Sequence, residues 1–290
     1  MSHNYVQQLI HVIWSTENQQ FKIPLATRNE LYAYLSMAIK DHQGKLYYAG
    51  GYWDHVHCLL SLPPTMSVSD MMRKIKSGSS QWIKNKENIG SKFSWENGFT
   101  VTSIQEDRVD SVCSYIKGDE KRHDKMTYRD ELLNILKLQN ISYSEEYFLR
   151  NSHSKFLLHL IWSTKNRSPY LEKAIRPSLY QQMCTTASEN DSIVHAIGGI
   201  EDHVHLLLEI SRKMALSDLV KDIKVKATHW LLKKSQSFNC FEWQVGYGGF
   251  SISLPTVDVV KQYIMQQEEH HKVCTSISEW NEFVFHKGVI

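Results

Sequence analysis

The chain has 290 residues, enough for two domains of roughly 145 residues each. Hydrophobic residues make up 42% and charged residues 22%, so each domain can bury an ordinary core. No apolar run approaches the ~20 residues that span a bilayer, and the N-terminus lacks the basic and apolar regions of a signal peptide. These features exclude membrane-spanning and secreted proteins, and we expect a cytoplasmic protein with no membrane partner.

Neither charge nor cysteine content identifies a partner or a metal. The net charge of +2 is weak evidence for a polyanionic partner. The five cysteines are odd in number and form no Cys-x-x-Cys pair, so free thiols are expected rather than disulfides or a thiolate zinc site.

The first half of the chain alternates strand and helix patterns. A β-branched run predicts a strand at 8–15, and apolar residues at helical spacing predict a helix at 25–41. Ser69 is expected to cap the second helix, with Asp70 in its first turn. The other predicted elements are strands at 46–49, 55–62 and 99–104, and a long helix from Val109 to about Leu138 that is broken or loosened near Gly118.

The second half repeats this order. Strands are predicted at 156–163, 193–198, 203–210 and 250–254, and helices at about 179–189, at 218–234 with Ser217 as cap, and from Val257 to about His271. Residues 143–150 have no partner in the second half, and no Pro-rich or Gly/Ser-rich linker separates the halves. The order predicts an α+β fold, with an antiparallel sheet and helices on one face.

Identical residues recur at one spacing. Asp54-His55-Val56-His57 returns as Asp202-His203-Val204-His205, an offset of 202 − 54 = 148. Further pairs at this offset are Ile13–Thr16 with Ile161–Thr164, Trp82 with Trp230, Phe93 with Phe241, Trp95 with Trp243, and Tyr115-Ile116 with Tyr263-Ile264. We therefore predict two copies of one domain, at residues 1–150 and 151–290.

Each copy places two histidines on one face of a strand. Residues two apart in a strand point to the same side, so His55 and His57 lie side by side, as do His203 and His205. Two neutral imidazoles in this arrangement can bind a divalent cation and leave positions open for water or substrate oxygens. A single His-x-His pair is more often an ordinary part of a half-buried strand, so the rest of a site has to be found elsewhere.

A tyrosine in the last predicted helix of each copy supplies a candidate nucleophile. Tyr263 and Gln267 are four residues apart and share a helix face, as do Tyr115 and Asp119. A phenol is a weak nucleophile at its usual pKa of about 10, but beside a metal-polarised phosphate it can attack phosphorus. The amide or carboxylate oxygen one turn later can supply a third metal ligand.

These motifs together resemble those of the single-tyrosine HUH transposases of the insertion sequence 200/605 type. The resemblance rests on the Asp-His-Val-His strands, the lysines at positions 76 and 224, Trp95 and Trp243 with a glycine nearby, and the run Tyr263-Ile264-Met265-Gln266-Gln267-Glu268-Glu269-His270-His271, which ends in two late histidines. It covers both copies almost end to end, so the chain is similar to two fused transposase subunits. It implies a tandem pair of ferredoxin-like (RRM-like) domains forming an internal pseudo-dimer that requires no further oligomer.

The resemblance also implies a reaction and its residues. Family members cut and rejoin single-stranded or hairpin DNA: a tyrosine attacks the scissile phosphate, which leaves a 5′-phosphotyrosine and a 3′-OH. Mg²⁺ or Mn²⁺ is held by two histidines and the residue four after the tyrosine. Carried over, His55 and His57 would join Tyr263 and Gln267, while His203 and His205 would join Tyr115 and Asp119. Pairing within each copy is the alternative, and the sequence leaves both open.

Copy one departs from the family pattern. Asp119 stands where the pattern has Gln, Gly118 precedes it, and Arg122 replaces the first of two late histidines. A carboxylate remains a good ligand for a hard cation, but we expect the site with Gln267 to be the more family-like. The alternatives are a domesticated nickase, a non-catalytic DNA-binding protein on the same scaffold, and a zinc hydrolase, which is disfavoured because no third His, Cys or Glu stands at ligand spacing beside either pair.

The helix after each His strand is basic. Arg73 and Lys76 in copy one, and Lys221 and Lys224 in copy two, are the predicted contacts to DNA phosphates.

Overall fold

The computed structural model describes residues 4–86 and 92–285, and the chain folds as two compact units. We call residues 9–155 the first-copy unit, and residues 1–8 with 156–290 the second-copy unit. Each unit therefore includes a few residues from the other copy of the repeat.

The first-copy unit is built around an antiparallel sheet. Its strands and helices are β1 (Tyr5–Ser15, whose first residues belong to the other unit), α1 (Leu25–Asp41), β2 (Lys45–Gly51), β3 (His55–Leu62), α2 (Val68–Lys84), β4 (Thr100–Ser103), α3 (Val109–Lys117), α4 (Asp119–His123), α5 (Tyr128–Leu138) and β5 (His153–Lys155), with short 3₁₀ turns at Glu17–Gln19 and Glu106–Arg108. The strand order is β2-β3-β1-β4, with β1 antiparallel to β4 and β2 antiparallel to β3. This order along a βαββαβ chain confirms the expected ferredoxin-like domain.

The second-copy unit repeats the arrangement. Its elements are β6 (Leu157–Ser163), α6 (Arg176–Glu189), β7 (Ile193–Gly199), β8 (His203–Glu209), α7 (Leu216–Leu232), β9 (Gly248–Ile252), α8 (Val257–Met265), α9 (Gln267–His270) and α10 (Ser276–Phe285), with 3₁₀ turns at Lys165–Arg167, Gln236–Phe238 and Leu254–Thr256. The order β7-β8-β6-β9 matches that of the first copy, and β6 runs antiparallel to both β8 and β9. The tandem α+β architecture is confirmed.

Each unit gains a short parallel strand from the start of the other copy. Tyr5–Gln7 pair with Gly248–Phe250 in the second-copy unit, and β5 pairs with Thr100–Thr102 in the first-copy unit. Since 5 + 148 = 153, the two added strands are equivalent residues of the repeat. The alternation of apolar and polar residues along a strand could not reveal this exchange. The exchange depends on which sheet edge lies near the short strand in the folded chain.

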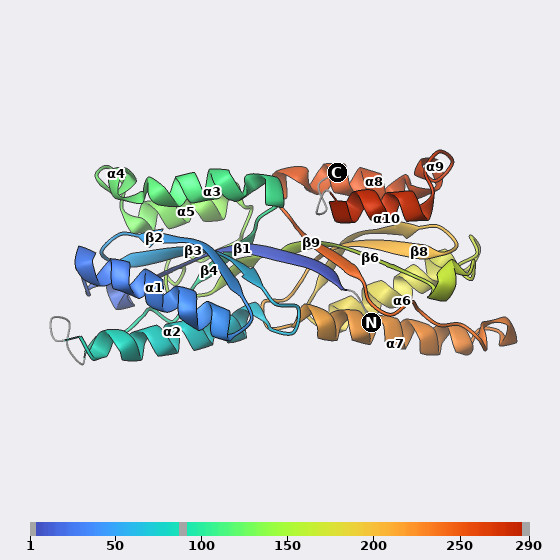
Figure 1. Cartoon of the computed structure of the whole chain (residues 1–290), viewed down its shortest axis with the longest axis horizontal. Helices are drawn as coiled ribbons and strands as arrows, with labels where there is room; N and C mark the ends of the chain where they lie inside the picture. The colour runs from blue at the N-terminus through green and yellow to red at the C-terminus, as the bar shows by residue number, and fades with distance from the viewer. Residues whose placement is uncertain (1–3, 87–91, 286–290) are drawn as a thin grey trace. The chain divides into compact units, whose positions relative to one another are not determined.

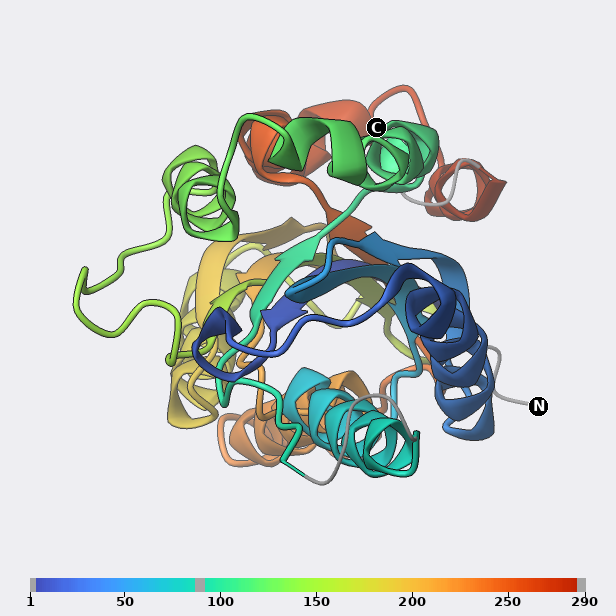
Figure 2. The same ribbon diagram turned by 90° about the vertical axis from the view of Figure 1, so that its left-hand side faces the viewer.

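Helices cover both faces of each sheet, so the expectation of helices on one face was wrong. Figure 1 shows α1 and α2 on one side of the first-copy sheet and α3 to α5 on the other, and Figure 2 shows this unit from its end, with the sheet between the two helical layers. Ile116 of α3 packs with Leu9, Leu59 and Ile104. Leu59 is two residues beyond His57, so both histidines of the pair face the layer that carries the tyrosine.

The ends of several helices differ from the predictions. Ser67, not Ser69, caps α2 by accepting a hydrogen bond from the amide of Asp70, and Ala215, not Ser217, precedes α7. The predicted long helix after β4 breaks after Lys117 and again after His123, where Thr127 begins α5 with a capping box. Copy two likewise breaks after Met265 and has a further helix, α10, that was not predicted.

Among the helices described, none is long and apolar enough to cross a membrane.

Candidate metal and tyrosine centres

The first histidine of each pair is oriented by the aspartate that precedes it. His55 Nδ1 donates to Asp54 Oδ1 at 2.7 Å, and His203 Nδ1 donates to Asp202 Oδ1 at 2.6 Å. Both rings are almost fully buried. The carboxylate fixes the ring so that Nε2 points away from it, which is the support that metal-binding histidines usually receive.

The second histidine of each pair is oriented by another histidine that the sequence analysis missed. His57 Nδ1 lies 3.0 Å from His11 Nε2, and His205 Nδ1 lies 3.0 Å from His159 Nε2. His11 and His159 stand at the repeat offset of 148, so the repeat could have identified them. Burial lowers the pKa of His205 to about 4, which keeps this ring neutral and able to act as a ligand.

The tyrosine helix lies close against the sheet because a glycine faces it. A Cβ on Gly198 of β7 would stand 2.1 Å from the carbonyl oxygen of Ile264, the residue after Tyr263. A Cβ on Gly50 of β2 in copy one would stand 2.6 Å from the Cγ2 atom of Ile116 and 3.3 Å from its carbonyl oxygen. The glycine thus permits the approach that brings Tyr263 to His205, whose ring centroids are 5.7 Å apart.

Gly198→Ala is therefore expected to push α8 off β7, to lower the free energy of unfolding by about 1–3 kcal/mol through overpacking, and to impair any reaction at Tyr263. Denaturant unfolding and DNA-adduct assays measure the two effects. Gly50→Ala is the matched control: it should destabilise copy one and leave chemistry at Tyr263 intact. Equal loss of adduct in both variants would contradict this placement.

Each His pair meets the helix of its own copy. His55 Nε2 lies 3.0 Å from Asp119 Oδ2, and His203 Nε2 lies 3.1 Å from Gln267 Oε1. Of the two pairings that the sequence left open, the structure has the one within each copy. Although burial opposes it, hydrogen bonds to Asp119 and Asp54 raise the pKa of His55, because both ring nitrogens face carboxylates.

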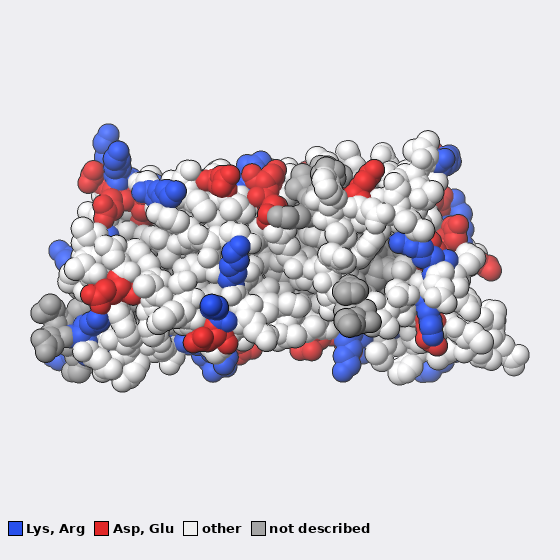
Figure 3. Space-filling view, in the orientation of Figure 1, with Lys and Arg blue, Asp and Glu red and all other residues white. Residues whose placement is uncertain are grey.

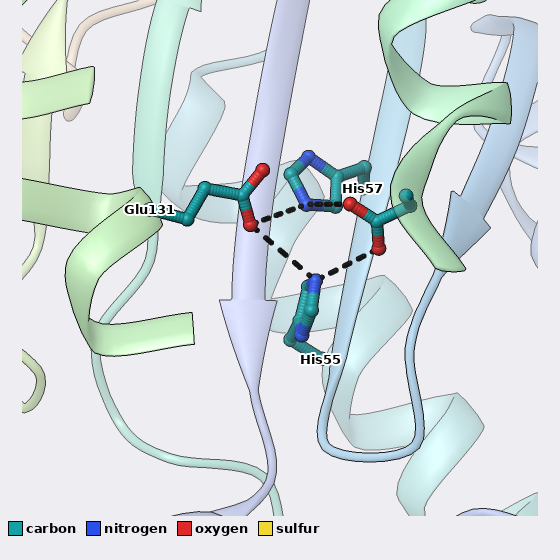
Figure 4. Close-up of side chains that lie close together, drawn as sticks. His55, His57 and Glu131 are labelled. Carbon is teal, nitrogen blue, oxygen red and sulfur yellow. Dashed lines mark hydrogen bonds and ion pairs between the residues drawn. The ribbon is translucent and has the colours of Figure 1, made fainter. Parts of the chain in front are cut away.

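A glutamate completes each cluster, and the sequence analysis missed it. Glu131 Oε2 of α5 lies 3.6 Å from His55 Nε2 and 3.4 Å from His57 Nε2, and Figure 4 shows this carboxylate reaching both rings from a helix opposite the His strand. Glu279 of α10 lies 3.4 Å from His203 Nε2 and 3.3 Å from His205 Nε2. The premise that no further Glu stands beside the pairs was therefore wrong. Both glutamates are buried, and their spacing is again 279 − 131 = 148.

The same glutamates hold the tyrosine hydroxyls. Tyr115 donates to Glu131 Oε1 at 2.5 Å, and Tyr263 donates to Glu279 Oε1. Burial, followed by the charge of the glutamate, raises the pKa of both tyrosines above the ordinary value. Each phenol is thus protonated, half-buried, and paired with a carboxylate that can accept its proton.

The clusters have the donor chemistry of a divalent-cation site. Ligand atoms of His55, His57, Asp119 and Glu131 lie within 4.8 Å of one another, as do those of His203, His205 and Glu279. The Nε2 atoms of His57 and His205 are buried and make no hydrogen bond of good geometry within the described residues, and each offers a lone pair to a cation when its ring is protonated at Nδ1. Two imidazoles with carboxylate or amide oxygens fit Mn²⁺ well, and the oxygens also suit Mg²⁺.

Copy one already holds a cation from its own chain. Arg122 donates through Nε to Glu131 Oε1 at 2.9 Å and through Nη2 to Asp119 Oδ1, and its guanidinium lies 3.8 Å from the centre of the Tyr115 ring. The residue at this position in copy two is His270, which is 3.8 Å from Glu279 Oε1 and partly exposed. The guanidinium thus neutralises the carboxylates that a metal would need in copy one, whereas no guanidinium lies at the equivalent place in the described part of copy two.

Two of the four predicted phosphate contacts, Lys76 and Lys224, bind backbone carbonyls of their own chain. Lys76 Nζ donates to the carbonyl oxygens of Glu96, Asn97 and Gly98, and Lys224 Nζ donates to those of Gln244 and Gly246. Burial lowers the pKa of each to about 8. These lysines hold a loop in place, and their role in DNA binding stays a prediction.

The other two predicted contacts, Arg73 and Lys221, are exposed, and Arg73 pairs with Asp70 at 2.9 Å. On the face seen in Figure 3, basic and acidic side chains are interspersed.

Lys224→Met is expected to lower the free energy of unfolding by about 2 kcal/mol or more, because charged hydrogen bonds to two carbonyls are lost. Lys221→Ala is the control, and it should change stability little. Thermal unfolding of both variants checks this. If Lys224→Met left the melting temperature unchanged and only reduced the salt dependence of DNA binding, the lysine would act on phosphate and not on the loop.

Comparison with known proteins identifies the family. Residues 4–119 and 152–267 each match the family described as "Transposase IS200 like". The ISDra2 transposase TnpA of Deinococcus radiodurans is 27% identical over 116 residues, covering 38% of this chain and 83% of the relative. A solved structure described as that of a transposase from Deinococcus radiodurans R1 has 27% identity and a TM-score of 0.31, covering 38% of this chain and 89% of that chain.

A second solved structure, the REP-associated tyrosine transposase bound to a REP hairpin, has 16% identity and a TM-score of 0.34, covering 43% of this chain and 74% of that chain. The two family matches together span most of the sequence, one in each copy. The chain therefore belongs to the IS200-like transposases, enzymes that act on DNA, and carries two copies of the family's domain in tandem.

Proposed function

We propose that the chain cleaves and rejoins single-stranded or hairpin DNA through a covalent bond between Tyr263 and a 5′-phosphate, and that copy two performs this reaction. The observation that carries the proposal is the convergence of Tyr263, Gln267 and Glu279 on the pair His203 and His205. Nucleophile, proton acceptor and candidate ligands thus meet within one unit.

The residues have distinct roles in the proposed reaction. The phenolic oxygen of Tyr263 attacks phosphorus, its proton passes to Glu279, and the 3′ oxygen of the cleaved strand leaves. The leaving oxygen takes up a proton and becomes a 3′-OH, which can attack the phosphotyrosine in the reverse sense and restore the phenol. Strand transfer therefore needs no nucleotide hydrolysis.

His203, His205, Gln267 and Glu279 would hold Mg²⁺ or Mn²⁺, which when bound polarises the scissile phosphate. Asp202 and His159 keep the two imidazoles facing the phosphate site. Copy one is proposed to contribute structure or DNA contacts, because Arg122 neutralises its carboxylates and covers Tyr115.

The test is to incubate the chain with labelled single-stranded oligonucleotides, with and without Mn²⁺, and to look for adducts that survive denaturation. The proposal expects a metal-dependent adduct and a free 3′-OH product. Binding without any adduct would support a non-catalytic DNA-binding protein, and cleavage without an adduct would support a metal-dependent hydrolase. An adduct that forms without subsequent strand joining would fit a nickase.

A further inference from the structure

A cavity of about 560 Å³ lies beside the His pair of copy two. Its lining includes His203, Arg167, Gln244, Tyr247, Trp280 and Tyr5, all of which belong to the second-copy unit. The volume is in the usual range for a small-ligand pocket. Since His203 is one of its walls, a molecule in the cavity would lie next to the candidate cleavage site.

The lining is suited to an unpaired nucleotide. Trp280 and Tyr5 meet edge to face with ring centroids 5.9 Å apart, and Trp280 is only half-buried, so it can take a base by stacking. Arg167 supplies a positive charge, and its Nη1 atom forms a long ion pair with Asp202 Oδ2 at 3.7 Å. The buried Tyr247 hydroxyl and Trp162 Nε1, which also face this cavity, make no hydrogen bond within the described residues.

In copy one, the chain itself covers the equivalent positions. Phe148 packs in one cluster with Ile13 and Leu132, the counterparts of the cavity residues Ile161 and Trp280. Phe148 lies in the stretch 143–151 that connects the two copies, and we call this stretch the connector.

The residues after Phe148 also contact positions of copy one that are equivalent to the cavity lining. Arg150 Nη2 donates to Asn18 Oδ1 at 3.3 Å, and a Cβ on Gly98 would stand 2.4 Å from the carbonyl oxygen of Asn151. Asn18 and Gly98 correspond to Asn166 and Gly246 of the copy-two cavity. The connector thus lies over the positions of copy one that are equivalent to the described lining of the copy-two cavity.

The charges at equivalent positions also favour nucleotide binding in copy two over copy one. Arg167 and Gln244 of the copy-two cavity correspond to Gln19 and Glu96 of copy one. A phosphate is attracted by the first pair and repelled by the carboxylate of the second.

We propose that the copy-two cavity binds an unpaired nucleotide of single-stranded DNA beside His203, and that the connector residues 143–151 block the equivalent pocket of copy one. This inference rests on the proposed function and deepens it, since it assigns substrate binding to one copy.

The test measures binding of a fluorescent deoxythymidine oligonucleotide to the full chain without metal, together with its stoichiometry. Trp280→Ala and Arg167→Ala are each expected to weaken binding about tenfold, and Trp280→Phe should retain much of it. Gln19→Ala, the matched change in copy one, should have no effect. One oligonucleotide per chain is expected at saturation.

Photo-crosslinking with 5-iododeoxyuridine in the oligonucleotide locates the base directly. Crosslinks to the peptides that contain Tyr247 or Trp280 are expected. Arg150→Ala with Phe148→Ser should add crosslinks in copy one if the variant folds, and the copy-two crosslinks of the parent chain test the proposal if it does not. Unchanged affinity of Trp280→Ala and Arg167→Ala, or equal crosslinking of both copies in the parent chain, would overturn it.

The two proposals fail separately. A covalent adduct at Tyr263 with no effect of Trp280→Ala on binding would remove the nucleotide pocket and keep the enzyme. Crosslinks at Trp280 without any adduct would keep the pocket and remove the proposed chemistry.

Discussion

Tyr263→Phe is expected to abolish covalent attachment to single-stranded DNA, with a loss of at least about a thousandfold, because phenylalanine lacks the hydroxyl oxygen that attacks phosphorus. Tyr115→Phe is expected to retain most of the adduct. The difference follows from the surroundings of the two phenols. Arg122 lies over the ring of Tyr115 and pairs with Asp119 and Glu131, whereas no guanidinium lies over Tyr263 in the described part of copy two.

Labelled oligonucleotides with Mn²⁺, followed by denaturing electrophoresis, provide the measurement. The Tyr115→Phe protein serves as the matched control for folding and DNA binding, since each change removes one hydroxyl that donates to a buried glutamate. Equal loss of adduct in the two variants would mean that both copies take part in the reaction. Full retention in Tyr263→Phe would assign the chemistry to copy one.

Wild-type protein is expected to bind one Mn²⁺ tightly per chain, at the copy-two cluster. His205→Ala should weaken this binding by about 10–100-fold or more, since a direct ligand is at least as important as the supporting residues for which that range is typical. His57→Ala should leave it unchanged. Calorimetric titration gives both affinity and stoichiometry.

The reason for a single tight site can be tested by exchanging one residue. Arg122→His gives copy one the residue that copy two has at position 270, and it removes the guanidinium that pairs with Asp119 and Glu131. We expect a second Mn²⁺ to bind to this variant. Two sites of equal affinity in the unmodified chain would refute the idea that Arg122 takes the place of the metal.

The repeat and the local patterns predicted most of the scaffold. The strand that carries the first His pair begins and ends at the residues expected, His55–Leu62, because its apolar run and the two prolines that follow it are local signals. The break at Gly118 was also expected, and it places Asp119 at the start of α4, facing His55.

The glutamate of each cluster could not be found by local patterns, because the chain turns back toward the His pair only after that break. Glu131 lies 74 residues from His57 along the sequence, and only the turn between α4 and α5 brings it within 3.4 Å. A search for ligands at short spacing cannot find such a residue. The offset of 148 could have found it, because Glu131 and Glu279, and likewise His11 and His159, are identical pairs at that spacing.

The difference between the copies was only partly visible in the sequence. Arg122 and Asp119 stood out as departures from the family pattern. Only the structure shows that they form an ion pair and that the Arg122 guanidinium lies over the Tyr115 ring. The contact of Phe148 with Ile13 and Leu132 joins residues far apart in the chain, and no periodicity signals it.

The most direct test of the account is to digest the covalent complex of the unmodified chain with single-stranded DNA and to identify the modified peptide by mass spectrometry. The account predicts a nucleotide phosphate attached to Tyr263, with Tyr115 unmodified. Attachment at Tyr115 alone, or at any residue other than these two tyrosines, would contradict it.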